Sequence, residues 1–238
     1  MRQKITVSWS GGKDSALALH KILTSKIFEV ANIHTVIDAA TKRVGLHGVS
    51  ETLIERQANE IGIPLEKIYI PSTDDTSAYE TQLKTFYQRC SEEGIVGVAF
   101  GDIHLQDLKE YRILLLKPSG LSAIFPLWGL ESSFILKEII DAGFKTRICA
   151  ANASLFSIDR VGGIIDDHFV ETLPQGVDHC GENGEFHTFV YGGPLFKSEI
   201  KIAAGDVVRQ VYRYKKLNPD GEIEDVETAF WFRDYLQL

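Results

Sequence analysis

The sequence feature that most constrains the fold is SWSGGKDSALALH at residues 8–20, where a short apolar run meets a glycine pair and a helical pattern follows. Gly11 and Gly12 allow close backbone approach and a positive φ. A strand, a glycine-rich turn and a helix in this order present backbone N–H groups at a helix N-terminus, where partial positive charge favours phosphate. The stretch predicts a phosphate-binding loop; the alternative is an incidental polar turn between strand and helix.

The side chains of residues 10–15, the glycine loop, suit a polyphosphate. Ser10 and Ser15 add hydroxyl donors, and Lys13 adds a point charge. Asp14 fits beside a polyphosphate mainly if a Mg²⁺ ion lies between them. The loop fails the Walker A pattern, because Val7 stands where the first glycine belongs and Asp14 follows the lysine.

A second acidic position follows the expected strand at residues 95–100, where Gly101 and Asp102 come next in the chain. Ligands of open α/β sheets bind outside the carboxyl ends of the strands. Asp14 and Asp102 are therefore expected to face one crevice and to share Mg²⁺. The alternative for Asp102 is a helix N-cap or an Asx turn.

The first half of the chain alternates short apolar runs with helical patterns, which is typical of a parallel sheet. We expect an α/β, Rossmann-like parallel sheet with a smaller C-terminal α+β domain. Gly62 and Gly94 stand where helix ends are expected. The expected strands lie at residues 5–9, 30–37, 67–70 and 95–100, and the expected helices at residues 50–61 and 77–93.

The character of the sequence changes after residues 125–129, which predicts an ATP-binding domain at residues 1–128 and a substrate-binding domain at residues 129–238. The second domain begins with a helix at residues 133–142 and a strand at 146–150. Alternating polar and apolar residues flank the turn tetrad at 218–221 and predict antiparallel hairpin strands. Aromatic residues in this tail are expected either to complete a sheet or to form a homodimer seam: Phe230, Trp231, Phe232 and Tyr235.

Composition narrows the class of function. The net charge of −8 disfavours an electrostatic grip on nucleic acid. The apolar runs are too short to cross a membrane, and the first residues do not resemble a signal peptide. Three widely spaced cysteines, at positions 90, 149 and 180, argue against a disulfide framework. We therefore expect a cytoplasmic protein with reduced thiols and no nucleic-acid or membrane partner.

Residues 178–190, DHCGENGEFHTFV, form the second segment dense in functional groups. Glu182 and Glu185 can surround an ammonium-bearing substrate or serve as bases; the alternative is that they cap turns or face solvent. The adjacent His179 and Cys180 would point in opposite directions in an extended chain, which disfavours a zinc site.

The motif SGGKDS resembles the pyrophosphate loop of the N-type ATP pyrophosphatases, which split ATP between the α and β phosphates. Five further segments narrow the resemblance to the diphthine–ammonia ligase family, also called diphthamide synthetases, in a bacterial-type branch; they lie at residues 101–103, 107–108, 111–112, 126–129 and 178–190. The resemblance extends from Ser10 to about Phe196 and implies an adenine nucleotide alpha hydrolase-like fold.

This resemblance implies that ATP and Mg²⁺ serve to adenylate a substrate carboxylate, protein-borne or small, and that ammonia then displaces AMP. The expected catalytic residues are Lys13, Asp14, Asp102, Glu182 and Glu185. The expected nucleotide-binding residues are Ser10, Gly11, Gly12, Lys13, Asp14, Ser15, His34, His47 and Gly101. The expected substrate-binding residues are Arg112, Asn183, Gly184 and His187.

Two of these histidines have structural alternatives. His34 lies in an apolar strand, whose backbone could meet adenine, and such a histidine is often a satisfied core residue. His47 could instead stabilise its loop by a hydrogen bond. Two other functions also stay open at this point, namely an adenylyltransferase acting on tRNA or a small molecule, and an ATP-binding protein without turnover.

Overall fold

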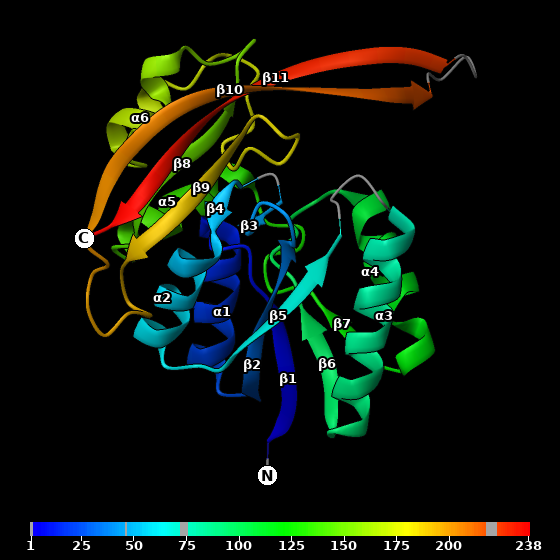
Figure 1. Ribbon diagram of the computed structural model, residues 1–238. Coiled ribbons are helices and arrows are strands. Elements are labelled where there is room, and N and C mark those ends of the chain that lie inside the picture. Colours follow the sequence, from blue (N-terminus) through cyan, green and yellow to red (C-terminus); the bar gives the residue numbers. More distant parts are fainter. Residues whose placement is uncertain (1, 46, 72–75, 218–222) are drawn as a thin grey trace.

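The computed structural model describes residues 2–45, 47–71, 76–217 and 223–238, which form two sheets (Figure 1). In the larger sheet, strands pair in parallel in the order β5, β2, β1, β6, β7. A small antiparallel extension of β2 is formed by β3 (Arg43–Val44) and β4 (Val49–Ser50). The parallel strands are β1 (Gln3–Ser8), β2 (Phe28–Asp38), β5 (Leu65–Ile70), β6 (Ile95–Ala99) and β7 (Ser122–Ile124).

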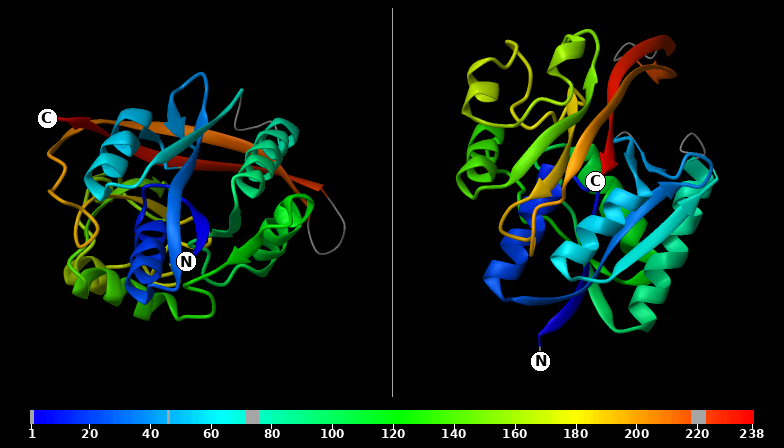
Figure 2. Two further views of the ribbon diagram at one scale, coloured as in Figure 1. Left: turned by 90° about the horizontal axis from the view of Figure 1, so that it is seen from below. Right: turned by 60° about the vertical axis from the view of Figure 1, so that its left-hand side comes forward.

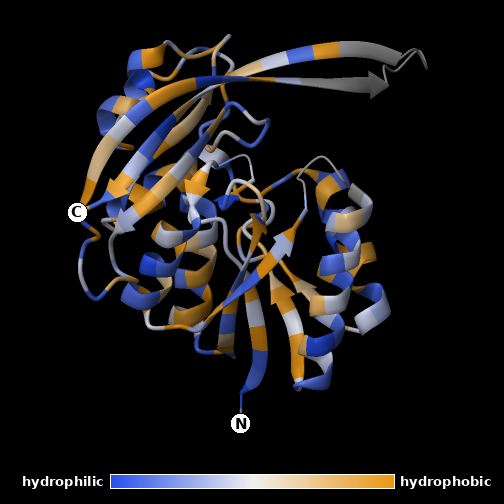
Figure 3. Cartoon of the chain, in the orientation of Figure 1, coloured by the Kyte–Doolittle hydropathy of each residue, from blue (hydrophilic) through white to orange (hydrophobic). Residues whose placement is uncertain are grey.

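Helices cover both faces of the parallel sheet, as the views in Figures 1 and 2 show. One face packs against α1 (Lys13–Ser25), α2 (Glu51–Ile61) and α5 (Ser132–Asp141). The other face packs against α3 (Thr76–Glu92) and α4 (Gln106–Leu116). Figure 3 shows apolar residues along the central strands and on the sheet-facing sides of these helices. The predicted α/β, Rossmann-like class is confirmed.

Helix α2 illustrates how the sequence sets these boundaries. Leu53, Ile54 and Ala58 are buried along one face. Gly62 then takes a left-handed φ of 78° and its N–H donates to the Ala58 carbonyl, which ends the helix as predicted. The predicted α3 and α5 are also confirmed, each one residue earlier than expected.

The smaller sheet is antiparallel in the order β10, β11, β8, β9. Its strands are β8 (Lys145–Asn152), β9 (Phe186–Gly192), β10 (Ile202–Leu217) and β11 (Ile223–Gln237), and the short helix α6 (Asp167–Glu171) lies beside them. The predicted hairpin strands are confirmed, whereas the predicted turn at 218–221 lies outside the described residues. Figure 1 shows β10 and β11 extending together as a long arm past the rest of this sheet.

One continuous core joins the two sheets. Helix α5, which follows the predicted boundary at 128, packs with α1 and forms the Lys21–Glu138 ion pair at 2.6 Å. Phe230, Phe232 and Tyr235 are buried, which favours the core interpretation of the aromatic tail. The domain boundary itself stays a prediction. Within the described part of the chain, no helix combines the length and apolar character that a membrane span requires.

Candidate functional site

A cleft of about 700 Å³ opens at the carboxyl ends of β1, β2, β5 and β6 and is closed on one side by the smaller sheet. Its position is the one that open α/β topology predicts for a ligand. Lining residues include members of the glycine loop, the segment after β6 and the smaller sheet: Ser10, Lys13, Asp14, Ser15, His47, Gly101, Asp102, Arg112, Glu182, Gly184, His187, Thr188 and Tyr212.

The glycine loop requires both glycines at its centre. Gly11 has a φ of +81°, and a Cβ there would lie 2.6 Å from Ile54 Cδ1 and 2.8 Å from Gln57 Oε1. A Cβ on Gly12 would lie 2.8 Å from His47 Cε1. The loop is thus held close to α2 and to the segment around His47, and any larger residue would displace it.

Strand β9 is bonded directly to the glycine loop. The Lys13 backbone N–H donates to Thr188 Oγ1 at 3.0 Å, and the Val190 N–H donates to the Gly11 carbonyl at 2.9 Å. Gln57 Nε2 donates both to the Gly11 carbonyl and to the Val190 carbonyl, at 3.0 and 2.6 Å. One N–H at the start of α1 therefore already has a protein acceptor, and sequence reasoning missed both Gln57 and Thr188.

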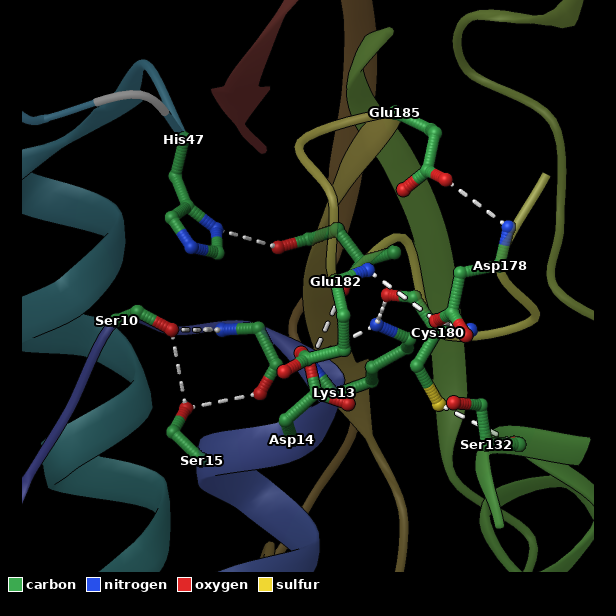
Figure 4. Close-up of polar contacts among 12 residues, drawn as sticks. Ser10, Lys13, Asp14, Ser15, His47, Ser132, Asp178, Cys180, Glu182 and Glu185 are labelled. Atoms are coloured by element: carbon green, nitrogen blue, oxygen red, sulfur yellow. Dashed lines mark hydrogen bonds and ion pairs between the residues drawn. The ribbon is translucent and has the colours of Figure 1, made fainter. Parts of the chain in front are cut away.

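Lys13 is turned away from solvent, with 2% of the residue exposed. Its Nζ donates to Asp14 Oδ2 at 2.8 Å and to the Cys180 carbonyl, and lies 5.2 Å from the centre of the Phe186 ring (Figure 4). Burial disfavours the ammonium form and is the largest single influence, but Asp14, Cys180 and Glu182 together outweigh it and hold the pKa of Lys13 above its ordinary value. The ammonium is thus paired within the protein, and the expected contact of Lys13 with phosphate stays a prediction.

Asp14 and Asp102 each have one carboxylate oxygen that accepts no hydrogen bond from the described residues, and the one on Asp102 faces Arg112. Asp14 Oδ1 and Asp102 Oδ2 are buried and have no hydrogen-bond partner among the described residues. Burial raises the pKa of Asp102, with a smaller rise from the Asp14 charge, while Arg112 opposes it. The N-cap of α4 is Leu105, so Asp102 does not cap that helix. Two neighbouring carboxylates, each with an oxygen that accepts no hydrogen bond, are a donor set that fits Mg²⁺.

Arg112 lies beside Asp102, with 3.5 Å between Arg112 Nε and Asp102 Oδ2. Its guanidinium also lies 5.0 Å from the centre of the Phe100 ring, and its Nη1 is 3.5 Å from Tyr79 Oη. These contacts hold Arg112 at the wall of the cleft. The predicted role as a clamp for an anionic substrate stays a prediction, since the charge is already paired.

Gly101 lies close to the backbone of the glycine loop where α1 begins. A Cβ there would lie 2.9 Å from the Asp14 carbonyl carbon and 3.0 Å from the Ser15 nitrogen, both backbone atoms of the start of α1. We expect Gly101→Ala to weaken nucleotide binding by about tenfold or more, because backbone cannot yield as a flexible side chain can. Calorimetric titration with Mg-ATP measures this affinity. Gly129→Ala would not serve as a control, because Gly129 has a φ of +77° and an alanine there would be strained.

A suitable control for that variant is Ala40→Gly, which changes an exposed turn residue remote from the cleft lining. Its affinity is expected to match that of the unmodified protein. An unchanged affinity in Gly101→Ala would show that the start of α1 can shift without cost to the ligand.

Residues 178–185, the acidic loop, contain two glutamates that lie in different surroundings. Glu182 lines the cleft. Burial, with a further contribution from the Asp14 charge, raises the pKa of Glu182 to about 7, although the influence of the Ile103 backbone N–H acts to lower it. A carboxyl group with such a pKa can exchange protons near neutral pH.

Glu185 is buried inside the loop and does not line the cleft, as Figure 4 also shows. Its carboxylate accepts from the Asp178 N–H at 3.0 Å, from the Asn183 N–H at 2.9 Å and from Asn183 Nδ2 at 3.0 Å. The expected catalytic role of Glu185 is therefore corrected, because its carboxylate shapes the loop, whereas the expected substrate contact of the exposed Asn183 stays a prediction. Gly184 does line the cleft.

The three histidines considered from the sequence occupy two environments. His34 is buried in the core between Thr6 and the Phe86 ring, and burial, aided by Arg112, lowers its pKa to about 3. Its side chain lies in the core and does not line the cleft, which corrects any nucleotide contact of this imidazole, whereas the expected contact of the strand backbone with adenine stays a prediction. His47 and His187 both line the cleft, with 4.8 Å between their ring centres.

Cysteine and zinc chemistry receive no structural support. Cys180 donates its thiol to the Ser132 carbonyl at 3.3 Å, and burial raises its pKa, which disfavours the nucleophilic thiolate. In the described ranges, no three histidine, cysteine, aspartate or glutamate side chains gather as a metal site.

Comparison with known proteins identifies the family of the chain. Family models described as the diphthamide synthase N-terminal and C-terminal domains match residues 3–121 and 131–218. The chain belongs to the diphthamide synthase family. Two curated relatives of this family are named diphthine–ammonia ligase: the Danio rerio protein is 26% identical and the Homo sapiens protein 25% identical. Each alignment covers 84% of this chain, and it covers 86% and 82% of the two relatives.

Among solved structures, the chain resembles a U34-tRNA thiolase from Methanococcus maripaludis, with 19% sequence identity and a TM-score of 0.39. That match covers 59% of this chain and 58% of the thiolase.

Proposed function

We propose that the protein is an ATP-dependent amide ligase that adenylates a substrate carboxylate and then amidates it with ammonia. The observation that supports this most directly is the pair of neighbouring carboxylates, Asp14 and Asp102, each with one oxygen that accepts no hydrogen bond, next to a glycine loop at the carboxyl edge of a parallel sheet. The names of the family and its relatives point to a diphthine-type carboxylate.

In this proposal the glycine loop and the start of α1 hold the β and γ phosphates, so that the substrate carboxylate oxygen can attack the α-phosphorus in line. The bond to the bridging oxygen breaks and pyrophosphate leaves. Asp14 and Asp102 would hold Mg²⁺, which neutralises phosphate charge when it is bound. The acyl adenylate remains on the side of the cleft that Glu182 lines.

Glu182 is the proposed general base of the second step. The ammonia nitrogen attacks the acyl carbon, the bond to AMP breaks, and the nitrogen loses a proton. A carboxylate whose pKa is about 7 accepts that proton near neutral pH. Lys13 acts as a positioning residue, because its ammonium joins Asp14 to the Cys180 carbonyl of the acidic loop.

The proposal is tested by incubating the protein with Mg-ATP, ammonium and candidate carboxylates. We expect AMP and pyrophosphate in equal amounts, together with the amide, because the α–β bond of ATP is the one that breaks. Chromatography of nucleotides with an enzymatic pyrophosphate assay measures both products. Release of ADP and phosphate in place of AMP and pyrophosphate would reject the proposal.

Several narrower predictions are kept as such. They are a cytoplasmic location, a homodimer, an adenylyltransferase acting on tRNA or a small molecule, and ATP binding without turnover. No observation in the described residues favours the last two over the amide ligase.

A further inference from the structure

The cationic side chains of the main cleft are already paired with carboxylates. Among the described residues that line it, the cationic ones are Lys13 and Arg112. Lys13 Nζ lies 2.8 Å from Asp14, and Arg112 Nε lies 3.5 Å from Asp102. A polyphosphate entering this cleft would therefore meet little uncompensated positive charge from lysine or arginine, and buried charge that lacks compensation is costly.

The His47 imidazole is placed where it can supply that charge. A Cβ on Gly12 would lie 2.8 Å from His47 Cε1 and 3.3 Å from His47 Nδ1, so the ring lies against the centre of the glycine loop. His47 Nδ1 is 3.1 Å from the Thr188 carbonyl oxygen. A carbonyl only accepts, so Nδ1 carries the hydrogen in the neutral ring and Nε2 is left bare.

A bare Nε2 cannot donate to phosphate, whose oxygens are acceptors. The nucleotide can gain a hydrogen bond from this nitrogen only after Nε2 takes a proton. We propose that His47 binds the phosphates of the nucleotide as an imidazolium, so that nucleotide binding takes up one proton from solvent. This inference rests on the proposed function, in which the cleft binds Mg-ATP.

The surroundings of His47 are consistent with one proton taken up on that ring. Without nucleotide, burial lowers the pKa of His47, while the Thr188 carbonyl and the Asp14 charge oppose that shift. His187, 4.8 Å away between ring centres, has its pKa held well below its usual range by burial, then by His47 and Lys13. The charged groups that act on the two rings are Lys13 and Asp14, and Glu182 and Tyr212 line the same cleft. Arg43, which is paired with Asp234, donates to the carbonyl of Gly48, the residue after His47.

The proton count also predicts the direction of the pH dependence. Binding that takes up a proton weakens as pH rises, by up to about tenfold per pH unit between the pKa of the free and of the bound imidazole. A neutral contact from His47 would instead leave the affinity level over the same range.

The test is calorimetric titration with Mg-ATP near pH 7 in two buffers of different ionisation enthalpy. We expect uptake approaching one proton per nucleotide in the unmodified protein and near zero in His47→Asn, whose amide can keep the hydrogen bond to the Thr188 carbonyl while Nε2 is removed. His168→Asn makes the same change at an exposed histidine of α6 outside the cleft lining, and this matched control is expected to keep the uptake.

The possible results separate the two proposals. Nucleotide binding without proton uptake, or uptake that persists in His47→Asn, would overturn the inference and leave the proposed function standing. Uptake lost in His168→Asn as fully as in His47→Asn would also overturn it. Failure of the unmodified protein to bind Mg-ATP would reject the proposed function and, with it, this inference.

Discussion

Asp14→Asn is expected to reduce AMP formation by about a thousandfold. The asparagine removes the negative charge that would hold Mg²⁺ against the phosphates, and electrostatic groups of this kind are commonly worth two to three orders of magnitude in rate. A discontinuous assay of AMP, with saturating ATP and ammonium, measures the loss. Full activity in this variant would remove Asp14 from the proposed mechanism.

The same substitution also disturbs Lys13, whose buried Nζ lies 2.8 Å from Asp14 Oδ2. Removing one partner of such a pair leaves a buried charge, at a cost of about 3 kcal/mol in the free energy of unfolding. The double variant Lys13→Met with Asp14→Asn removes the ammonium too. Urea denaturation is expected to show recovered stability in the double variant, while AMP formation stays absent, which separates the catalytic role from the structural one.

Glu182→Gln is expected to lower the rate of amide formation by about a hundredfold or more and to change its pH profile. The carboxyl group must be ionised to accept the ammonia proton, and its pKa is about 7. In the unmodified protein, with the concentration of free NH3 held constant at each pH, kcat/KM for ammonia should therefore rise with pH through about 7 and then level off. In the glutamine variant this rising limb should be absent.

Glu185→Gln is the matched control, since it makes the same chemical change three positions further along the acidic loop. Its amide nitrogen cannot accept from the Asp178 and Asn183 N–H groups as the carboxylate does. We expect a loss of about 1–3 kcal/mol in the free energy of unfolding and an unaltered shape of the pH profile. If the rising limb of the pH profile survives in Glu182→Gln, then a group other than Glu182 is the general base.

Local patterns predicted much of the fold and part of the site. The glycine pair at positions 11 and 12 and the order of apolar runs were enough for the parallel sheet and the loop at its edge, because both depend on nearby residues. Helix α4 was missed: Ile113 and Leu114 are 47% and 64% exposed, so its apolar residues do not follow one face. Contacts with the rest of the fold, and not a regular apolar face in its own sequence, stabilise that helix.

The details of the site could not be predicted because they depend on contacts between distant segments. The Lys13 N–H meets Thr188 across 175 positions of the chain, and the Lys13 ammonium meets the Cys180 carbonyl. Sequence reasoning therefore assigned that charge to phosphate. Glu182 and Glu185 were equivalent by type and neighbourhood, and only the turn of the acidic loop directs one into the cleft and the other into its own backbone.

The bonds from β9 to the glycine loop bear on how this enzyme can be assembled. Gly11 and Lys13 are synthesised first, yet their partners Val190 and Thr188 emerge from the ribosome only after most of the chain has been made. Contacts between residues so far apart in the sequence slow folding, and the early segments lack their partners until most of the chain has been made. The candidate site is therefore completed late in folding, because the first sheet alone has the glycine loop without the strand that holds it in place.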